Sequence, residues 1–107
     1  MKTFNHPNLE EVTLSKVMLA LADPNRVTIV NTMKKANGKA FSCKEFELGI
    51  SKSTRSHHFE ILRNAGIIQT RPEGTKNLSS LREKELNERF PGLLGLIATE
   101  DLMTQKT

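Results

Sequence analysis

Residues 51 to 58 gather hydroxyl, imidazole and cationic side chains within about two helical turns, with no large apolar residue among them. In order they are Ser51, Lys52, Ser53, Thr54, Arg55, Ser56, His57 and His58. Groups of these types hydrogen-bond base edges and phosphates in the major groove of DNA. An ordinary solvated start of a helix has a similar composition, so the flanking segments must decide between the two interpretations.

The same residues open a helix whose two ends are both marked. Ser51 is a preferred N-cap, because its hydroxyl can accept from a first-turn N–H. Gly66 suits the position just past the C-terminal end, where the chain often needs a positive φ. The last turns are apolar, with Phe59, Ile61, Leu62 and Ala65. Such a helix is anchored at its back and presents its polar, basic front.

Neither catalysis nor transition-metal binding is indicated. The histidines and serines of residues 51–58 lie on one helix front with no pocket around them. Paired carboxylates in an apolar setting, a nucleophile–base pair and a phosphate-binding glycine loop are not found. A metal site needs three or four convergent N or S ligands, whereas the chain has one Cys and three His. We therefore expect no enzyme activity, no metal and no cofactor.

The single cysteine, Cys43, is a candidate redox residue. It lies in the capping box Ser42-Cys43-Lys44-Glu45 and would occupy the first turn of a helix, where the dipole can stabilise a thiolate. Its oxidation, or a disulfide to a second subunit, would loosen the neighbouring helix between Ser51 and Gly66, which we call the reading helix. The alternative, which we favour, is a small, half-buried and inert residue.

Composition restricts the class of partner. A chain of 107 residues forms one domain with a modest core, and its net charge of +4 suits a polyanion. The absence of Trp and Tyr argues against single-strand or RNA binding, which depends on aromatic stacking. No signal peptide and no run long enough to span a bilayer are seen, so a reduced, cytoplasmic location is expected.

Three helices are expected before the reading helix. A polar tail leads into apolar residues at helical spacing over residues 9–22, which lie on more than one face. Asp23-Pro24 predicts the N-cap and first residue of a second helix, which Asn37-Gly38 ends. The capping box starts a short third helix ending at Gly49. Two short helices joined by a tight turn form a helix-turn-helix, whose second helix enters the major groove.

A β-hairpin is expected behind the reading helix. Residues 67–71 and 75–81 have the pattern of strands, and Pro72-Glu73-Gly74 between them has turn chemistry. Arg71 and Lys76 flank the tip, where they would reach a groove or a phosphate. Upstream, Ala40-Phe41 is long enough only for a single bridge of strand.

The sequence pattern of the C-terminal part predicts two helices. Residues 82–89 are strongly charged, and Phe90-Pro91-Gly92 breaks the pattern, with Pro91 as a first-turn residue of the last helix. That helix is more apolar than one small core requires, through Leu93, Leu94, Leu96, Ile97, Leu102 and Met103. Together with the first helix, this surplus predicts a homodimer.

Over roughly residues 14 to 94 the chain resembles the ArsR-type winged helix-turn-helix repressors. The resemblance rests on Leu21-Ala22-Asp23-Pro24-Asn25-Arg26, on residues 53–68, and on Glu73-Gly74. It implies a mainly α fold with a small β-hairpin wing, and a homodimer that leaves a palindromic operator when an effector arrives. By the family's pattern, Lys52, Ser53, Thr54, Ser56 and His57 face the DNA, whereas His58 and Phe59 lie nearer the core.

Two departures from that pattern are informative. Arg55 stands where relatives commonly carry an apolar residue: exposed, it would add a DNA contact, and turned inward it would need a partner. Residues 47–51 replace the Glu-Leu-Cys-x-Cys of many metal-sensing relatives, so both thiolate positions are empty. The C-terminal helix also lacks the Asp/His and His/Glu pairs of the other common metal site.

We therefore predict a homodimeric, DNA-binding transcriptional repressor. It would be a single domain (1–107), with dimerisation helices at 9–22 and 91–104, the helix-turn-helix at 43–65 and the wing at 67–81. The expected contacts with double-stranded DNA are Lys52, Ser53, Thr54, Arg55, Ser56, His57, Arg63, Arg71, Gly74 and Lys76. The effector is left open between a small molecule and an oxidant. The alternatives are a thiol-redox repressor acting through Cys43 and a winged-helix module that binds an acidic protein.

Overall fold

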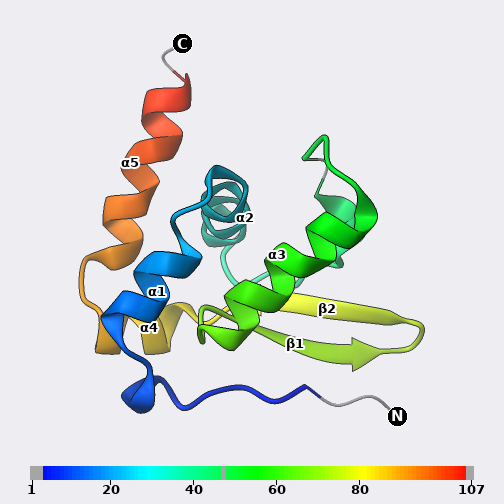
Figure 1. Cartoon of the computed structure of the whole chain (residues 1–107), viewed down its shortest axis with the longest axis horizontal. Helices are drawn as coiled ribbons and strands as arrows, with labels where there is room; N and C mark the ends of the chain where they lie inside the picture. Colours follow the sequence, from blue (N-terminus) through cyan, green and yellow to red (C-terminus); the bar gives the residue numbers. More distant parts are fainter. Residues whose placement is uncertain (1–3, 47, 106–107) are drawn as a thin grey trace.

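The computed structural model describes the backbone of residues 4–46 and 48–105, and side chains as far as Glu100 (Figure 1). In chain order the elements are η1 (Leu9–Glu11), α1 (Leu14–Ala20), α2 (Pro24–Lys35), η2 (Cys43–Glu45), α3 (Lys52–Asn64), β1 (Ile68–Glu73), β2 (Lys76–Leu81), α4 (Glu83–Arg89) and α5 (Leu93–Gln105). The predicted class, mainly α with one β-hairpin, is confirmed.

The predicted first helix is divided into η1 and α1. Val12 between them is extended, with φ −81° and ψ 131°. Thr13 then caps α1, and its hydroxyl accepts from the N–H of Lys16 at 3.2 Å. Continuity over residues 9–22 was therefore a wrong prediction, because a threonine side chain competes with the helical hydrogen bond. Arg89 donates to the carbonyl of Val12 at 3.1 Å and supplies a partner at the break.

The predicted start and end of the second helix are confirmed. Asp23 accepts from the N–H of Asn25 at 2.8 Å, and Pro24 is the first residue of α2. Asn37 and Gly38 follow its end with φ values of 52° and 87°. α2 contacts α3, α5 and β2, so it lies at the centre of the core. The largest fully buried side chains are Ile29, Met33, Leu62, Ile67, Ile68, Leu86, Leu94, Val17 and Val30.

The predicted third helix is only a single 3-10 turn, η2. The carboxylate of Glu45 accepts the N–H of Ser42 at 2.8 Å, as a capping box requires. Phe46 is already extended, with φ −100° and ψ 110°. The helix-turn-helix is thus reduced to η2, a turn and α3. Glu47, part of the segment compared with metal-sensing relatives, lies outside the described residues.

Aromatic packing explains why the helix does not continue. The ring of Phe46 lies between Phe41 and Phe59, with centroid distances of 5.2 Å and 5.4 Å. Burying this ring against α3 directs the chain out of a helical path, since packing energy exceeds local helix propensity. Phe41 also pairs with Ser79 of β2 in an isolated bridge, which confirms the single bridge predicted there.

The hairpin forms the predicted wing with a shorter turn. β1 and β2 are antiparallel, and Glu73 pairs with Lys76 across the two residues Gly74 and Thr75. Gly74 has a φ of 63°, which suits glycine. Pro72 was predicted in the turn but lies in β1 opposite Asn77. Proline is tolerated there because alternate pairs of an antiparallel ladder exchange no direct hydrogen bonds.

The C-terminal helices lie on the side of the molecule opposite the wing tip (Figure 1). α4 covers the predicted charged segment, and α5 contacts α2 and α4. Pro91 was predicted in the first turn of the last helix; it precedes α5 in a turn with Gly92, whose φ is 86°. Of the predicted apolar surplus, Leu102 and Met103 have side chains outside the described residues. No helix in the described part of the chain could cross a membrane.

Candidate nucleic-acid interface

α3 is built as a helix with an exposed front and a buried back. Ser51 caps it, accepting from the N–H of Thr54 at 3.2 Å. Helical geometry then turns successive residues by about 100°, so His57 and His58 face different surroundings. His58 is 6% exposed and Phe59 4%. Placing His58 on the same front as His57 was therefore a wrong prediction, and the position nearer the core implied by the family resemblance is confirmed. The side chains left exposed toward the N-terminal end are Lys52, Ser53, Thr54, Ser56 and His57.

Glu60 is an acidic neighbour of this front that sequence reasoning overlooked. Its carboxylate lies 3.7 Å from Nδ1 of His57, and both side chains are mostly exposed. The i, i+3 spacing was visible in the sequence and indicates such a contact on a helix. At 3.7 Å the contact is longer than a hydrogen bond, so Glu60 adds an exposed acidic group beside the front without fixing the imidazole.

Arg55 takes the inward arrangement of the two that the sequence left open. It is half-buried, and its Nη1 donates to the carbonyl of Phe46 at 3.5 Å. Its Nε is buried with no hydrogen-bond partner among the described residues. The guanidinium therefore lies between α3 and the chain that follows η2, and it does not stand on the exposed front.

The remaining predicted cations lie in two places, on the wing and on the rear half of α3. Arg71 and Lys76 are exposed on the wing, one on each strand, and Arg71 pairs with Glu73 at 3.2 Å. Gly74 forms the tip between them. Figure 1 shows the tip of the hairpin and the N-terminal end of α3 at the same end of the molecule. Arg63 lies further back on α3, half-buried beneath the N-terminal segment.

The N-terminal segment, which the sequence analysis described only as a polar tail, contacts this region. The ring of Phe4 lies 4.6 Å from the guanidinium of Arg63. His6 Nε2 accepts from the N–H of Thr70 at 2.9 Å. Partial burial, and then the nearby cations Arg82 and Arg63, lower the pKa of His6 below its ordinary value. Sequence patterns could not reveal these contacts, because the partners lie far along the chain.

Exposed apolar side chains lie on α1 and α5, two helices at the end of the molecule away from the wing tip (Figure 1). On α1, Leu14, Met18 and Leu19 are 49%, 58% and 73% exposed, and on α5 Leu96 is 67% exposed. Large apolar surfaces left exposed on a monomer are typical of contacts with another chain. We call these four residues the apolar face.

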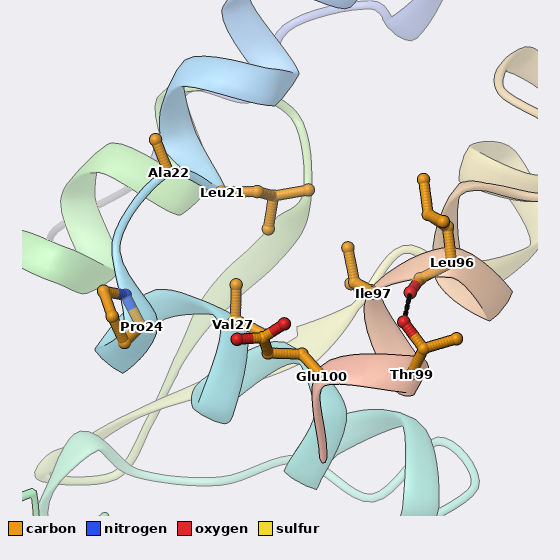
Figure 2. A pocket seen from close by; sticks show the side chains of 8 residues that line it. All are labelled: Leu21, Ala22, Pro24, Val27, Leu96, Ile97, Thr99 and Glu100. Carbon is orange, nitrogen blue, oxygen red and sulfur yellow. Dashed lines mark hydrogen bonds between the residues drawn. The ribbon is translucent and has the colours of Figure 1, made fainter. Parts of the chain in front are cut away.

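A hollow of about 390 Å³ adjoins the apolar face between the end of α1, the start of α2 and α5. Figure 2 shows Leu21, Val27 and Ile97 on its walls, and the hydroxyl of Thr99 donates to the carbonyl of Leu96 at 2.7 Å. None of the residues that line the hollow comes from α3 or the wing, so it belongs to the scaffold and not to the front of α3.

Residues 23–70, from the start of α2 to β1, match the model of the bacterial regulatory protein arsR family. Over 82 residues the chain is 37% identical to YceK of Bacillus subtilis strain 168, an uncharacterized HTH-type transcriptional regulator, covering 75% of this chain and 81% of the relative. The chain belongs to the ArsR family of bacterial regulatory proteins. The family suggested by the sequence is thereby confirmed. An uncharacterized HTH-type regulator of Methanocaldococcus jannaschii is 35% identical over 75 residues, 69% of this chain and 83% of that protein.

Solved structures agree with the assignment of this ArsR-family regulator. The transcriptional repressor BigR from Xylella fastidiosa superposes with a TM-score of 0.63 at 26% identity, covering 88% of each chain. The homodimeric winged helix-turn-helix DNA-binding domain of Mb0332 from Mycobacterium bovis gives 0.63 at 22% identity, with 81% and 79% covered. The latter likeness shows the fold alone. The winged helix-turn-helix prediction is confirmed, and the protein is a DNA-binding transcriptional regulator, not an enzyme.

The candidate redox residue of the regulator lies in a setting different from the expected one. Cys43 is half-buried in η2, which is one 3-10 turn and not the first turn of a helix. So short an element carries little dipole, and the predicted stabilisation of a thiolate loses its basis. Within residues 4–46 and 48–100, no three His, Cys, Asp or Glu side chains lie together as a metal site would require.

Proposed function

We propose that this regulator binds a palindromic operator in double-stranded DNA as a homodimer and represses transcription until a small-molecule or oxidant effector releases it. The observation that carries the proposal is the exposed front of α3, where hydroxyl, imidazole and ammonium groups are exposed while the back of the helix is buried. These groups suit base edges and phosphates in a major groove.

The expected contacts divide by chemistry. Ser53, Thr54, Ser56 and His57 would reach base edges or nearby phosphate oxygens, and Lys52 a phosphate. On the wing, Arg71, Gly74 and Lys76 would follow the adjacent backbone, where glycine allows close approach and the cations release counterions. Arg55 would contact a phosphate only if its hydrogen bond to the carbonyl of Phe46 broke, and Arg63 only if its guanidinium moved away from the ring of Phe4.

The apolar face supports the homodimer. A two-fold interface uses the same patch on both subunits, and the exposed apolar side chains of α1 and α5 would form it. Burial of apolar area contributes about 25 cal/mol per Å². The neighbour from Mycobacterium bovis is described as homodimeric and BigR as a transcriptional repressor, which accords with both parts of the proposal.

The test is selection of bound fragments from a random or genomic DNA pool by the full chain. The expected result is one motif with two inverted half-sites whose centres lie about one helical turn apart. A variant with Lys52→Ala and Ser56→Ala together should enrich the motif poorly, whereas Lys84→Ala on α4 serves as the control with an unchanged front. Recovery of no motif, with binding insensitive to salt, would overturn the proposal.

A further inference from the structure

One guanidinium joins three helices behind the front of α3. Arg26 is half-buried on α2 and its Nε donates to the carbonyl of Ala20, the last residue of α1. Its Nη1 lies 3.0 Å from Nδ1 of His58 on α3. The contact with His58 spans 32 positions in the sequence, so it is a tertiary link and not a local one.

The direction of the bond to His58 follows from the chemistry of the pair. Arginine has donors only, so Nδ1 of His58 must accept and its ring proton must lie on Nε2. The rigid planar fork of the guanidinium fixes the angle between its two acceptors, which a flexible lysine cannot do. His58 is only 6% exposed, so water competes little for this bond.

His58 lies about halfway along α3 and directly follows His57 of the exposed front. The two residues are about 100° apart around the axis of the same helix, so the rotation of α3 that places His58 also determines the direction in which His57 leaves the helix. Any rotation or tilt of α3 that breaks the bond to Arg26 would therefore displace His57 and Ser56. A displacement of about 1 Å is enough to break a hydrogen bond to a base, since hydrogen bonds tolerate only a few tenths of an ångström.

We propose that Arg26 and His58 are positioning residues for DNA reading. The pair sets the angle of α3 against α1, and α1 carries most of the apolar face. It thereby determines the spacing and rotation at which the two reading helices of a dimer meet the operator. This inference rests on the proposed function, but its first consequence, a fixed angle between α1 and α3, is measurable without DNA.

The first experiment measures that angle by pulsed electron resonance. Spin labels are attached at Ser15→Cys on α1 and Ser56→Cys on α3, both exposed positions, in a chain with Cys43→Ser. An excess of unlabelled chain restricts the signal to one protomer. His58→Leu replaces the imidazole by an apolar side chain without an acceptor, and should broaden or shift the distance distribution. His58→Asn, whose Oδ1 lies near the position of Nδ1, should restore the narrow distribution.

Two further variants separate positioning from stability and from direct reading. His57→Leu should leave the distance unchanged, since that ring is exposed and has no bond to Arg26. Arg26→Lys keeps the charge but reaches only one of the two acceptors at a time, and should broaden the distribution even if His58→Leu does not fold. A distribution identical to wild type in both Arg26→Lys and a folded His58→Leu overturns the proposal.

The second experiment uses the selected operator and an unrelated duplex. His58→Leu should weaken operator binding by about tenfold or more while binding to the unrelated duplex changes by less than about twofold, because phosphate contacts are not directional. His58→Asn should recover to within about threefold of wild type. Equal losses on both duplexes overturn the positioning role. A wild-type chain that selects no operator while its α1–α3 distance still depends on His58 would overturn the proposed function instead.

Discussion

The backbone N–H of Thr70, in β1, donates to Nε2 of His6 at 2.9 Å. This bond holds the N-terminal segment against the base of the wing and requires a neutral ring, because a protonated imidazole has no acceptor. The same segment is held by Arg82, whose Nη1 donates to the carbonyl of Pro7 at 2.9 Å. The N-terminal segment is thus tied to β1 through Thr70 and to the start of α4 through Arg82.

Acid should loosen this attachment. The pKa of His6 is lowered from its ordinary value of 6.5, first by burial and then by Arg82 and Arg63. A lowered histidine pKa means that the unfolded chain binds the proton more readily than the folded chain does. The contribution of His6 to the free energy of unfolding is therefore fully present above about pH 6.5 and is lost as the pH falls below it. Thermal unfolding between pH 5 and 8 should show this slope in wild type. His6→Gln keeps an acceptor that does not titrate and should flatten the slope; an unchanged slope would contradict the assignment.

Salt should weaken DNA binding steeply. Each phosphate that a cation neutralises contributes about −0.9 to the slope of log affinity against log salt concentration. Lys52→Ala and Lys76→Ala should each reduce the magnitude of that slope by about 1.8 per dimer, because each substitution removes one cation from both subunits on the DNA backbone. Lys84→Ala on α4 is the matched control and should leave the slope unchanged. Titrations by fluorescence anisotropy at several salt concentrations measure it, and a slope near zero in wild type would argue against phosphate binding.

Sequence discrimination should depend on His57 and Ser56. Alanine at either position should relax the preference for one base pair by about 1–3 kcal/mol, since a side chain that no longer reaches the base cannot penalise the wrong one. The measurement is competition between the selected operator and single-base variants. If His57→Ala weakens all competitors equally, that residue contacts the backbone and not a base.

A charge on the apolar face should prevent dimer formation. Leu19 is 73% exposed on α1, and burying a glutamate there in a subunit interface would cost several kcal/mol. Leu19→Glu should raise the dimer dissociation constant by at least about tenfold, a change of about 1.4 kcal/mol. Sedimentation equilibrium measures this dissociation constant, and Asn87→Glu, at an exposed position of α4, is the control. A Leu19→Glu chain that dimerises like wild type would place the interface elsewhere.

Gly66 should tolerate alanine worse than Gly38 does. Both have positive φ values, 78° and 87°. A Cβ at Gly66 would lie 2.6 Å from Cδ2 of Leu9, whereas nothing lies within 4 Å of one at Gly38. Gly38→Ala should therefore cost about 1–2 kcal/mol of backbone strain, and Gly66→Ala about 1–3 kcal/mol more through overpacking. Urea unfolding of both variants tests the difference, and equal losses would show that Leu9 moves away freely.

The local signals of the sequence were sufficient for α2, for α3 and for the presence of the wing, but not for the length of its turn. Ser51, Asp23-Pro24 and Gly66 mark helix ends through hydrogen bonds or φ values within a few residues, so no distant partner was needed to recognise them. The division of α3 into a polar front and an apolar back is likewise a local pattern. The exposure of Lys52 and His57 follows from it.

Only the tertiary structure decided the points at which distant groups compete with local preference. Packing of Phe46 against Phe59 limited the third helix to one turn, and the carbonyl of Phe46 drew Arg55 inward. The bond from Arg26 to His58 likewise depends on the packing of α2 against α3. In each case burial of the core brings together partners that are distant in the sequence. A pattern of neighbouring residues does not include the free energy of that burial, so it could not predict these contacts.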